Sequence, residues 1–134
     1  HVRIKFYYLL RKIAMSKPCT ISLPIVTVNP SSNSMKYVDD IISVTGTKRS
    51  EKIDILFDLL DVYITDTSSV LLYKEDVKRF ADQLAGKSMS SKEVFQIIKQ
   101  RLRLKYEVLK LSFDPRSLQF NGLKTAFIVH KRIN

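Results

Sequence analysis

The sequence predicts a mostly α-helical domain with a small antiparallel sheet, a winged-helix variant that carries an additional N-terminal helix and strand. Two observations support this class. A basic helix starting at Ser91 is followed by two alternating apolar and polar segments on either side of a turn at Asp114-Pro115-Arg116. The segments before it carry several amphipathic helical patterns. A helix followed by a two-stranded ribbon is typical of recognition and not of catalysis.

One domain is expected over residues 1–134, because 45% of the chain is apolar and its length allows a substantial core. The chain begins at His1 and not at Met, so we expect it to be a C-terminal fragment of a longer protein. Apolar residues at helical spacing predict a first helix over about four turns from Val2 to Ile13. Lys17-Pro18 should end it, since proline disfavours helical geometry in the preceding residue.

Residues 16–34 form the part least like a minimal helix-turn-helix, and we treat them as an insertion. Within it, Cys19–Val28 alternates and is rich in β-branched residues, which predicts a strand. Pro24 should confine this strand to the edge of a sheet or break it. After a turn, Met35–Val44 is predicted to be a short helix that closes at Gly46.

The next segment is predicted to be the central buried helix, with Ser50 as its N-cap. Its apolar stripe comprises Ile53, Leu56, Phe57, Leu60 and Ile64. A row of carboxylates, Asp54, Asp58 and Asp61, follows the remaining face. Such a row suits metal or acid–base chemistry, but without His or further acidic partners a solvated face or a docking place for basic residues is favoured.

The C-terminal half is predicted to contain two helices and three strands. Val70–Tyr73 reads as a short strand and Lys74–Ala85 as a helix that Gly86 closes. Ser90 and Glu93 have capping-box spacing and should open the last helix. The ribbon strands are expected at Leu104–Phe113 and Leu123–Ile133, with the turn at Asp114–Ser117 or at Gln119–Gly122.

Positive charge is concentrated at the C-terminal end. Eleven Lys and Arg residues against three acidic residues lie between Lys87 and Asn134, which accounts for eight of the ten net charges. This favours an acidic partner such as nucleic acid, although a basic solvated surface also aids solubility. The candidate phosphate contacts are Lys92, Lys99, Arg101, Arg103, Lys124, Lys131 and Arg132. Only Gln96 and Gln100 could read base edges, so nonspecific binding is favoured over sequence readout.

The apolar strand in the insertion suggests a second function. Its residues Ile21, Leu23, Ile25, Val26 and Val28 exceed what one face of a short edge strand needs for packing. An edge strand of this kind can pair with a second copy or with a partner peptide. The alternative is that both of its faces are buried as an additional core layer.

Motifs of enzymes are missing from the sequence. It has no phosphate-binding loop, no dinucleotide fingerprint, no zinc motif and only two His residues, so we expect neither an enzyme nor a cofactor, a metal or a small-molecule substrate. The single Cys19 cannot form an intrachain disulfide, which fits a reducing compartment. No apolar run has the length of a membrane span, and we expect no membrane partner.

The layout and three blocks, HVRIKFYYLL, ILFDLLDVYI and FNGLKTAFIVHKRIN, carry a resemblance. The chain is similar to the C-terminal winged-helix domains that follow AAA+ modules in origin-recognition-complex large subunits. It most resembles their yeast silencing paralogues of the silent information regulator type.

The resemblance implies a non-enzymatic, nuclear homodimerisation module of a chromatin silencing protein. Such a module supports assembly and spreading of silent heterochromatin, with other silencing or chromatin proteins as partners of the parent chain. Duplex DNA binding, mainly through phosphate contacts, is the alternative. A third is an adaptor that stays monomeric until a peptide pairs with its edge strand.

Overall fold

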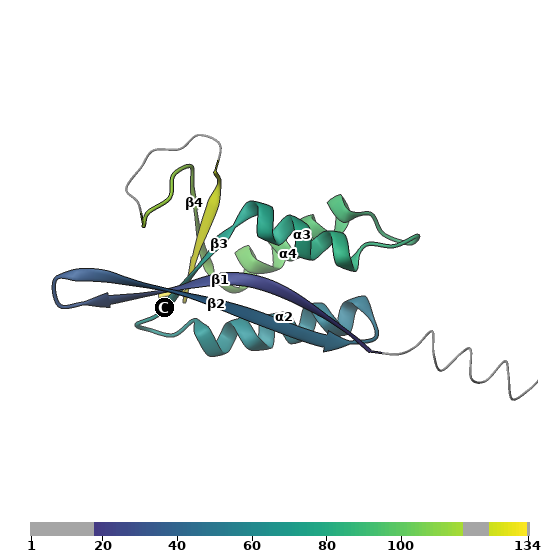
Figure 1. Cartoon of the computed structure of the whole chain (residues 1–134), viewed down its shortest axis with the longest axis horizontal. Coiled ribbons are helices and arrows are strands. Elements are labelled where there is room, and N and C mark those ends of the chain that lie inside the picture. Colours follow the sequence, from purple (N-terminus) through teal and green to yellow (C-terminus); the bar gives the residue numbers. More distant parts are fainter. Residues whose placement is uncertain (1–17, 117–123, 134) are drawn as a thin grey trace, which may run out of the picture.

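The computed structural model describes residues 18–116 and 124–133, which form a five-stranded antiparallel sheet and three helices (Figure 1). The elements in chain order are β1 (Cys19–Ser31), β2 (Ser34–Gly46), α2 (Arg49–Tyr63), β3 (Ser69–Tyr73), α3 (Lys74–Leu84), α4 (Ser91–Lys105), β4 (Glu107–Leu111) and β5 (Ala126–His130). The sheet order is β2-β1-β3-β5-β4. A long hairpin thus extends one side of a sheet whose other three strands are short.

The β1–β2 hairpin is paired over its whole length, from Cys19 opposite Gly46 to Ser31 opposite Ser34. Its tip projects past the rest of the described structure (Figure 1). β1 also pairs with β3, but only from Val26 to Val28. The far end of the hairpin therefore lies beyond the three-stranded part of the sheet.

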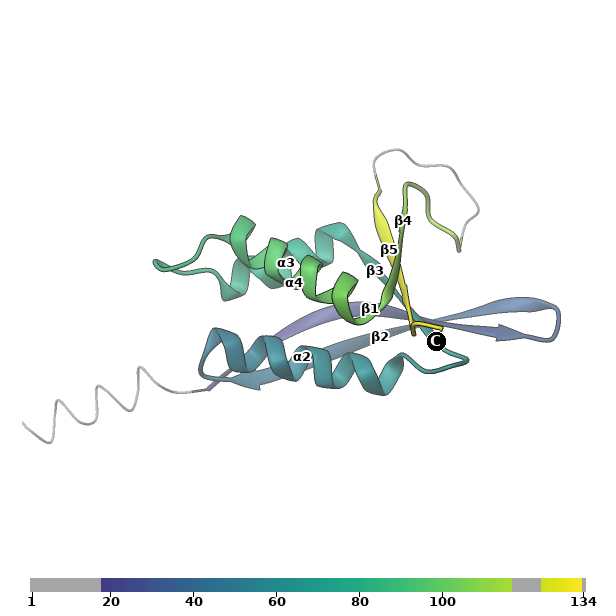
Figure 2. The ribbon, with the colours of Figure 1, turned by 180° about the vertical axis from the view of Figure 1, so that it is seen from behind.

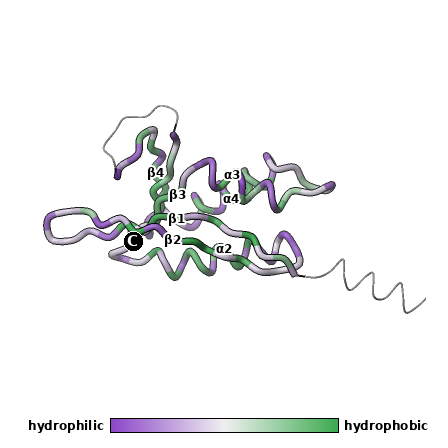
Figure 3. The backbone as a smooth tube through the Cα atoms, viewed as in Figure 1, coloured by the Kyte–Doolittle hydropathy of each residue, from purple (hydrophilic) through white to green (hydrophobic). Residues whose placement is uncertain are grey.

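All three helices pack on one face of the sheet. Alternate residues of the strands, such as Leu23, Val70 and Phe127, point to this face and join apolar residues of the helices in the larger core. The helical members at its centre include Leu56, Phe57, Leu60, Phe80, Val94 and Ile98, each at most 2% exposed. Figure 3 shows hydrophobic stretches where β1, β2 and α2 lie together, and a hydrophilic tip between α3 and α4.

A smaller cluster lies on the opposite face of the sheet. Val26, Val28, Leu71 and Ala126 are buried there, and Tyr37, Tyr73 and Ile128 pack against them. β1 thus contributes buried side chains to both faces, Leu23 to one and Val26 to the other.

The predicted fold class, a mostly helical winged-helix variant with a small sheet, is wrong. The structure is an α/β fold with 39% strand and 38% helix, and its sheet has five strands. The main cause is the segment Met35–Val44, which was predicted to be a helix and is part of β2. Its apolar residues Val38, Ile41 and Ile42 fit helical spacing, but Ile42 and Val44 alternate with exposed neighbours, and the whole segment pairs with β1.

The prediction that β1 is an edge strand is also wrong, because β1 lies between β2 and β3. Pro24 is tolerated because β3 pairs with β1 only from Val26 onward, so position 24 lies past the last residue paired on that side. The two edges of the sheet are β4 and β2, and β2 contains the segment that was predicted to be a helix.

Most predictions for the segment after residue 48 agree with the structure. The three helices, the short strand before α3 and the two ribbon strands are present in the predicted order. The capping box of α4 is confirmed, since Ser90 and Glu93 bond reciprocally. Ser50 is not the N-cap of α2, because Lys48 occupies that position without a side-chain cap. The predicted helix over Val2–Ile13 lies outside the described residues.

Candidate functional site

The outer side of α4 carries a stripe of basic side chains. Lys92, Gln96, Lys99 and Arg103 follow one another at spacings of four, three and four residues, so they share one stripe of the helix. The opposite side carries Val94, Ile98 and Leu102, which are buried in the core. Figure 2 shows α4 on the near side of the molecule, next to α3, with β4 following its C-terminal end.

Two further cations join this stripe from other elements. Lys74 is the first residue of α3, and Lys110 lies on β4 opposite Phe127, on the face that the helices cover. The pKa of Lys99 lies below its ordinary value, first because partial burial disfavours the charge. Repulsion from the three neighbouring cations, Arg103, Lys110 and Lys74, lowers this pKa further. Lys99 is therefore the centre of a cluster that spans α3, α4 and β4.

We define the outer basic cluster as Lys74, Lys92, Lys99, Arg103 and Lys110. In the described part of the chain, none of these five residues forms an ion pair with a carboxylate. A groove of about 480 Å³ between α3 and α4 adjoins the cluster and includes Lys74, Lys92 and Lys99 in its lining. Two carboxylates, Glu75 and Asp82, also line the groove, and Glu75 lies 4.0 Å from Lys78. An anion would relieve the repulsion within the cluster.

The cations on the side of α4 that faces α2 are paired. Arg101 lies 2.7 Å from Asp54, and its guanidinium carbon is 4.5 Å from the centre of the Phe57 ring. Lys105 lies 2.6 Å from Asp61, which also accepts a hydrogen bond from the Tyr106 hydroxyl. Asp54 and Asp61 thus dock basic residues, as the sequence analysis favoured.

The structure separates the seven predicted phosphate contacts. Lys92, Lys99 and Arg103 belong to the outer basic cluster, whereas Arg101 is bound to α2. Lys124 lies over the Tyr73 ring and Lys131 pairs with Asp66, both away from the cluster. Arg132 adjoins the cluster, because it donates to the backbone carbonyl of Arg103. Lys74 and Lys110 were missed, because only the fold brings α3 and β4 next to α4.

The five residues predicted as a dimer interface are all buried. Ile21, Leu23 and Ile25 belong to the larger core, and Val26 and Val28 belong to the cluster on the opposite face, with exposed fractions between 1% and 6%. This is the alternative that the sequence analysis had left open, an additional core layer. These side chains offer no surface to a second copy.

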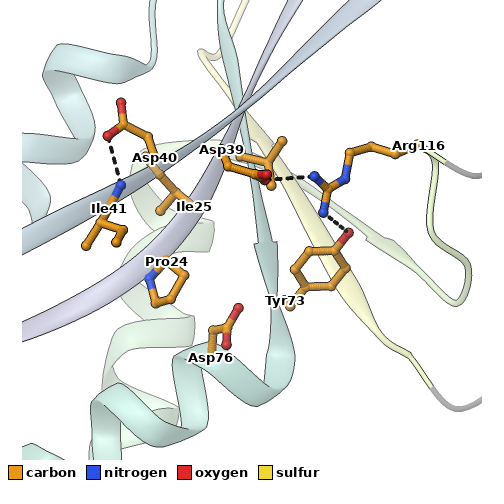
Figure 4. A pocket seen from close by; sticks show the side chains of 9 residues that line it. Pro24, Ile25, Asp39, Asp40, Ile41, Tyr73, Asp76 and Arg116 are labelled. Carbon is orange, nitrogen blue, oxygen red and sulfur yellow. Dashed lines mark hydrogen bonds and ion pairs between the residues drawn. The ribbon is translucent and has the colours of Figure 1, made fainter.

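A pocket of about 570 Å³ lies between β1, β2, the start of α3 and the segment after β4 (Figure 4). Arg116, from the segment after β4, lies 2.7 Å from Asp39 and donates to the Tyr73 hydroxyl at 3.4 Å. Asp76 at the rim pairs with Arg79 at 2.9 Å. Because these charged groups are paired with one another, we interpret the contacts as structural: they hold the segment after β4 against the β1–β2 hairpin.

No protein-family model, curated protein or solved structure matches the chain. Within the described ranges, no three His, Cys, Asp or Glu residues form a group that could hold a metal ion. None of the helices that the structure describes is long and apolar enough to cross a membrane.

Proposed function

We propose that this chain binds duplex DNA through the phosphate backbone, with the outer basic cluster as its contact surface. The observation that supports the proposal is the contrast in pairing on α4. Its inner cations are held by carboxylates of α2, whereas the outer ones gather around Lys99 without a carboxylate partner. A polyanion provides the missing counter-charge, and release of its condensed counterions drives binding.

The geometry suits a duplex. The stripe from Lys92 to Arg103 spans roughly 16 Å along the helix axis, since each residue rises about 1.5 Å. A helix fits the DNA major groove, which is about 12 Å wide. Lys74 and Lys110 flank the stripe and would contact the adjacent backbone.

Little sequence preference is expected. The basic residues of the stripe can donate to guanine as well as to phosphate, but Gln96 is the residue of the stripe whose side chain both donates to and accepts from a base edge. Phosphate contacts position a protein on the duplex but carry no direct sequence information. Affinity should therefore depend strongly on salt and weakly on sequence.

The test is fluorescence anisotropy with a short mixed-sequence duplex, measured between about 50 and 200 mM salt. Five phosphate contacts predict a log–log slope of about −4.5. Lys99→Glu/Arg103→Glu should weaken binding roughly 10- to 100-fold and make the slope shallower by about two.

The matched control is Lys48→Glu/Lys87→Glu, which changes the net charge equally at two exposed cations outside the cluster. It should cost much less affinity. Equal losses in both double variants would reduce the proposal to a net-charge effect, and no binding at the lowest salt would overturn it.

The resemblance to silencing proteins, with a nuclear role and chromatin partners, stays a prediction. Backbone contact with DNA is compatible with that role, but the outer basic cluster supports only the binding itself.

A further inference from the structure

β2 is an edge strand with an accessible outer side. It is 13 residues long and, in the part of the chain that the structure describes, pairs only with β1. Met35, Val38 and Ile41 are 56%, 42% and 59% exposed, although they are large and apolar. Natural edge strands usually avoid long exposed apolar stretches, because such edges pair with other chains.

The outward backbone groups of β2 are not bonded to β1, and of these the Ile41 N–H already has a bond, to Asp40, that pairing would have to replace. Ser31 and Ser34 are opposite each other across a two-residue turn, so in this hairpin the even-numbered residues of β2 bond to β1. The N–H and C=O groups of odd-numbered residues point outward. The Ile41 N–H agrees with this, because it donates to the carboxylate of the adjacent Asp40 at 2.8 Å and not to β1 (Figure 4).

β2 is complementary to itself in one register. A twofold axis perpendicular to the sheet places two copies of an edge strand antiparallel, with paired residues on the same face. When the axis passes through Val38, the opposite pairs are Met35 with Ile41, Lys36 with Asp40, Tyr37 with Asp39, and Val38 with itself. Every exposed apolar side chain of β2 then meets another, and Lys36 meets a carboxylate.

Neighbouring registers lack this match. An axis through Asp39, Asp40 or Lys36 places a charged residue opposite its own copy, which is unfavourable. An axis through Tyr37 places Lys36 opposite Val38 and Asp39 opposite Met35, so charges face apolar side chains. The distribution of charge along β2 thus selects the register centred on Val38.

We propose that two copies of this chain associate through their β2 edges, antiparallel about a twofold axis at Val38, so that two five-stranded sheets become continuous. This surface differs from the predicted interface on β1, whose side chains are buried. One strand pair buries less than the roughly 1,200 Å² of a standard interface, so the dimer should dissociate on dilution.

A charge-swap cycle followed by sedimentation equilibrium tests the register on the full chain without DNA. Lys36→Asp and Asp40→Lys should each weaken the dimer roughly tenfold, because each places like charges opposite each other. The double variant Lys36→Asp/Asp40→Lys should restore it. A monomer at every concentration, or a double variant as weak as the single ones, would overturn the proposal.

Cysteine cross-linking provides an independent readout. In a Cys19→Ser background, Val38→Cys should form a disulfide between copies, because the two Cα atoms of such a non-hydrogen-bonded pair lie about 4.5 Å apart. Ser43→Cys is the matched control, since Ser43 is also exposed on β2 but meets residue 33 of the second copy in this register. Equal cross-linking at both positions would argue against the twofold axis at Val38. A chain that stays monomeric until a peptide is added would instead assign this edge to a different partner.

Discussion

The two sides of α4 carry the same kinds of basic residues, but within residues 18–116 and 124–133 only those that face α2 form ion pairs. Toward α2, Arg101 and Lys105 are bound by Asp54 and Asp61. On the outer side, Lys99 and Arg103 repel each other and have no carboxylate partner among the described residues. The difference comes from the neighbouring elements and not from the helix. A count of basic residues therefore overstates the surface that is free to bind a polyanion.

The ion pairs between α4 and α2 contribute little free energy and mainly fix the position of α4 against α2. The side chains of Arg101 and Asp54 are 40% and 63% exposed, and ion pairs at such positions stabilise a fold by roughly 1 kcal/mol or less. The Tyr106 bond to Asp61 matters more, because Tyr106 is buried and needs an acceptor for its hydroxyl. Burial and this bond to Asp61 raise the pKa of Tyr106, which keeps the hydroxyl a donor.

The largest effect should follow from removing the acceptor on the inner side. Asp61→Ala leaves the Tyr106 hydroxyl without its bond and frees Lys105, so the free energy of unfolding should fall by about 1–3 kcal/mol. Chemical denaturation measures this. Asp61→Asn keeps an acceptor oxygen and should recover part of the loss. Equal stability of the native protein and Asp61→Ala would mean that α4 does not depend on α2 at this contact.

The same contact predicts a dependence on pH. Burial raises the pKa of Asp61, but the hydrogen bonds from Lys105 and Tyr106 and the charge of Lys105 outweigh this and leave it below its usual value. A carboxylate with a lowered folded pKa adds stability that is complete above the unfolded pKa of about 3.9 and is lost as pH falls through the folded pKa. The stability difference between the native protein and Asp61→Asn should therefore shrink as pH falls below about 4.

A smaller loss is expected for Arg101→Gln. The substitution removes the ion pair with Asp54 and the cation above the Phe57 ring, which together should cost about 0.5–1.5 kcal/mol. Thermal unfolding at low and high salt separates the two contributions, because salt screens the ion pair more than the ring contact. DNA affinity should change little; a loss as large as that of an outer substitution would place Arg101 in the binding surface.

Lys99→Gln is expected to have the smallest effect on the free energy of unfolding. It should nevertheless weaken DNA binding. Removing the cation from its repulsive neighbours should leave stability unchanged or raise it by about 0.5 kcal/mol. The salt slope of DNA binding should become shallower by about one. Parallel denaturation and anisotropy titrations would show this split, and a marked loss of stability would make Lys99 a structural residue.

The sequence was sufficient where local signals agree with one another. The apolar stripe with Leu56 and Leu60 predicted the buried helix α2, and the Ser90–Glu93 spacing predicted the start of α4. The acidic row on α2 indicated a docking place for basic residues, which Asp54 and Asp61 confirm. The helical stripe and the cap depend on neighbours within one or two helical turns, so they are visible without the fold, whereas the partners of Asp54 and Asp61 lie more than 40 residues away on α4.

Tertiary structure decided what depends on pairing between distant segments. Val38, Ile41 and Ile42 fit helical spacing better than the alternation of a strand, and only pairing with β1 makes the segment a strand. That outcome buried Ile21 and Leu23, moved the sheet edge to β2, and made the fold α/β. It likewise brought Lys74 and Lys110 to Lys99, because residues separated along the chain interact only where the fold closes the distance. The sequence by itself determined α2, α3 and α4 and the charge of α4, and the fold decided which of those charges stay unpaired.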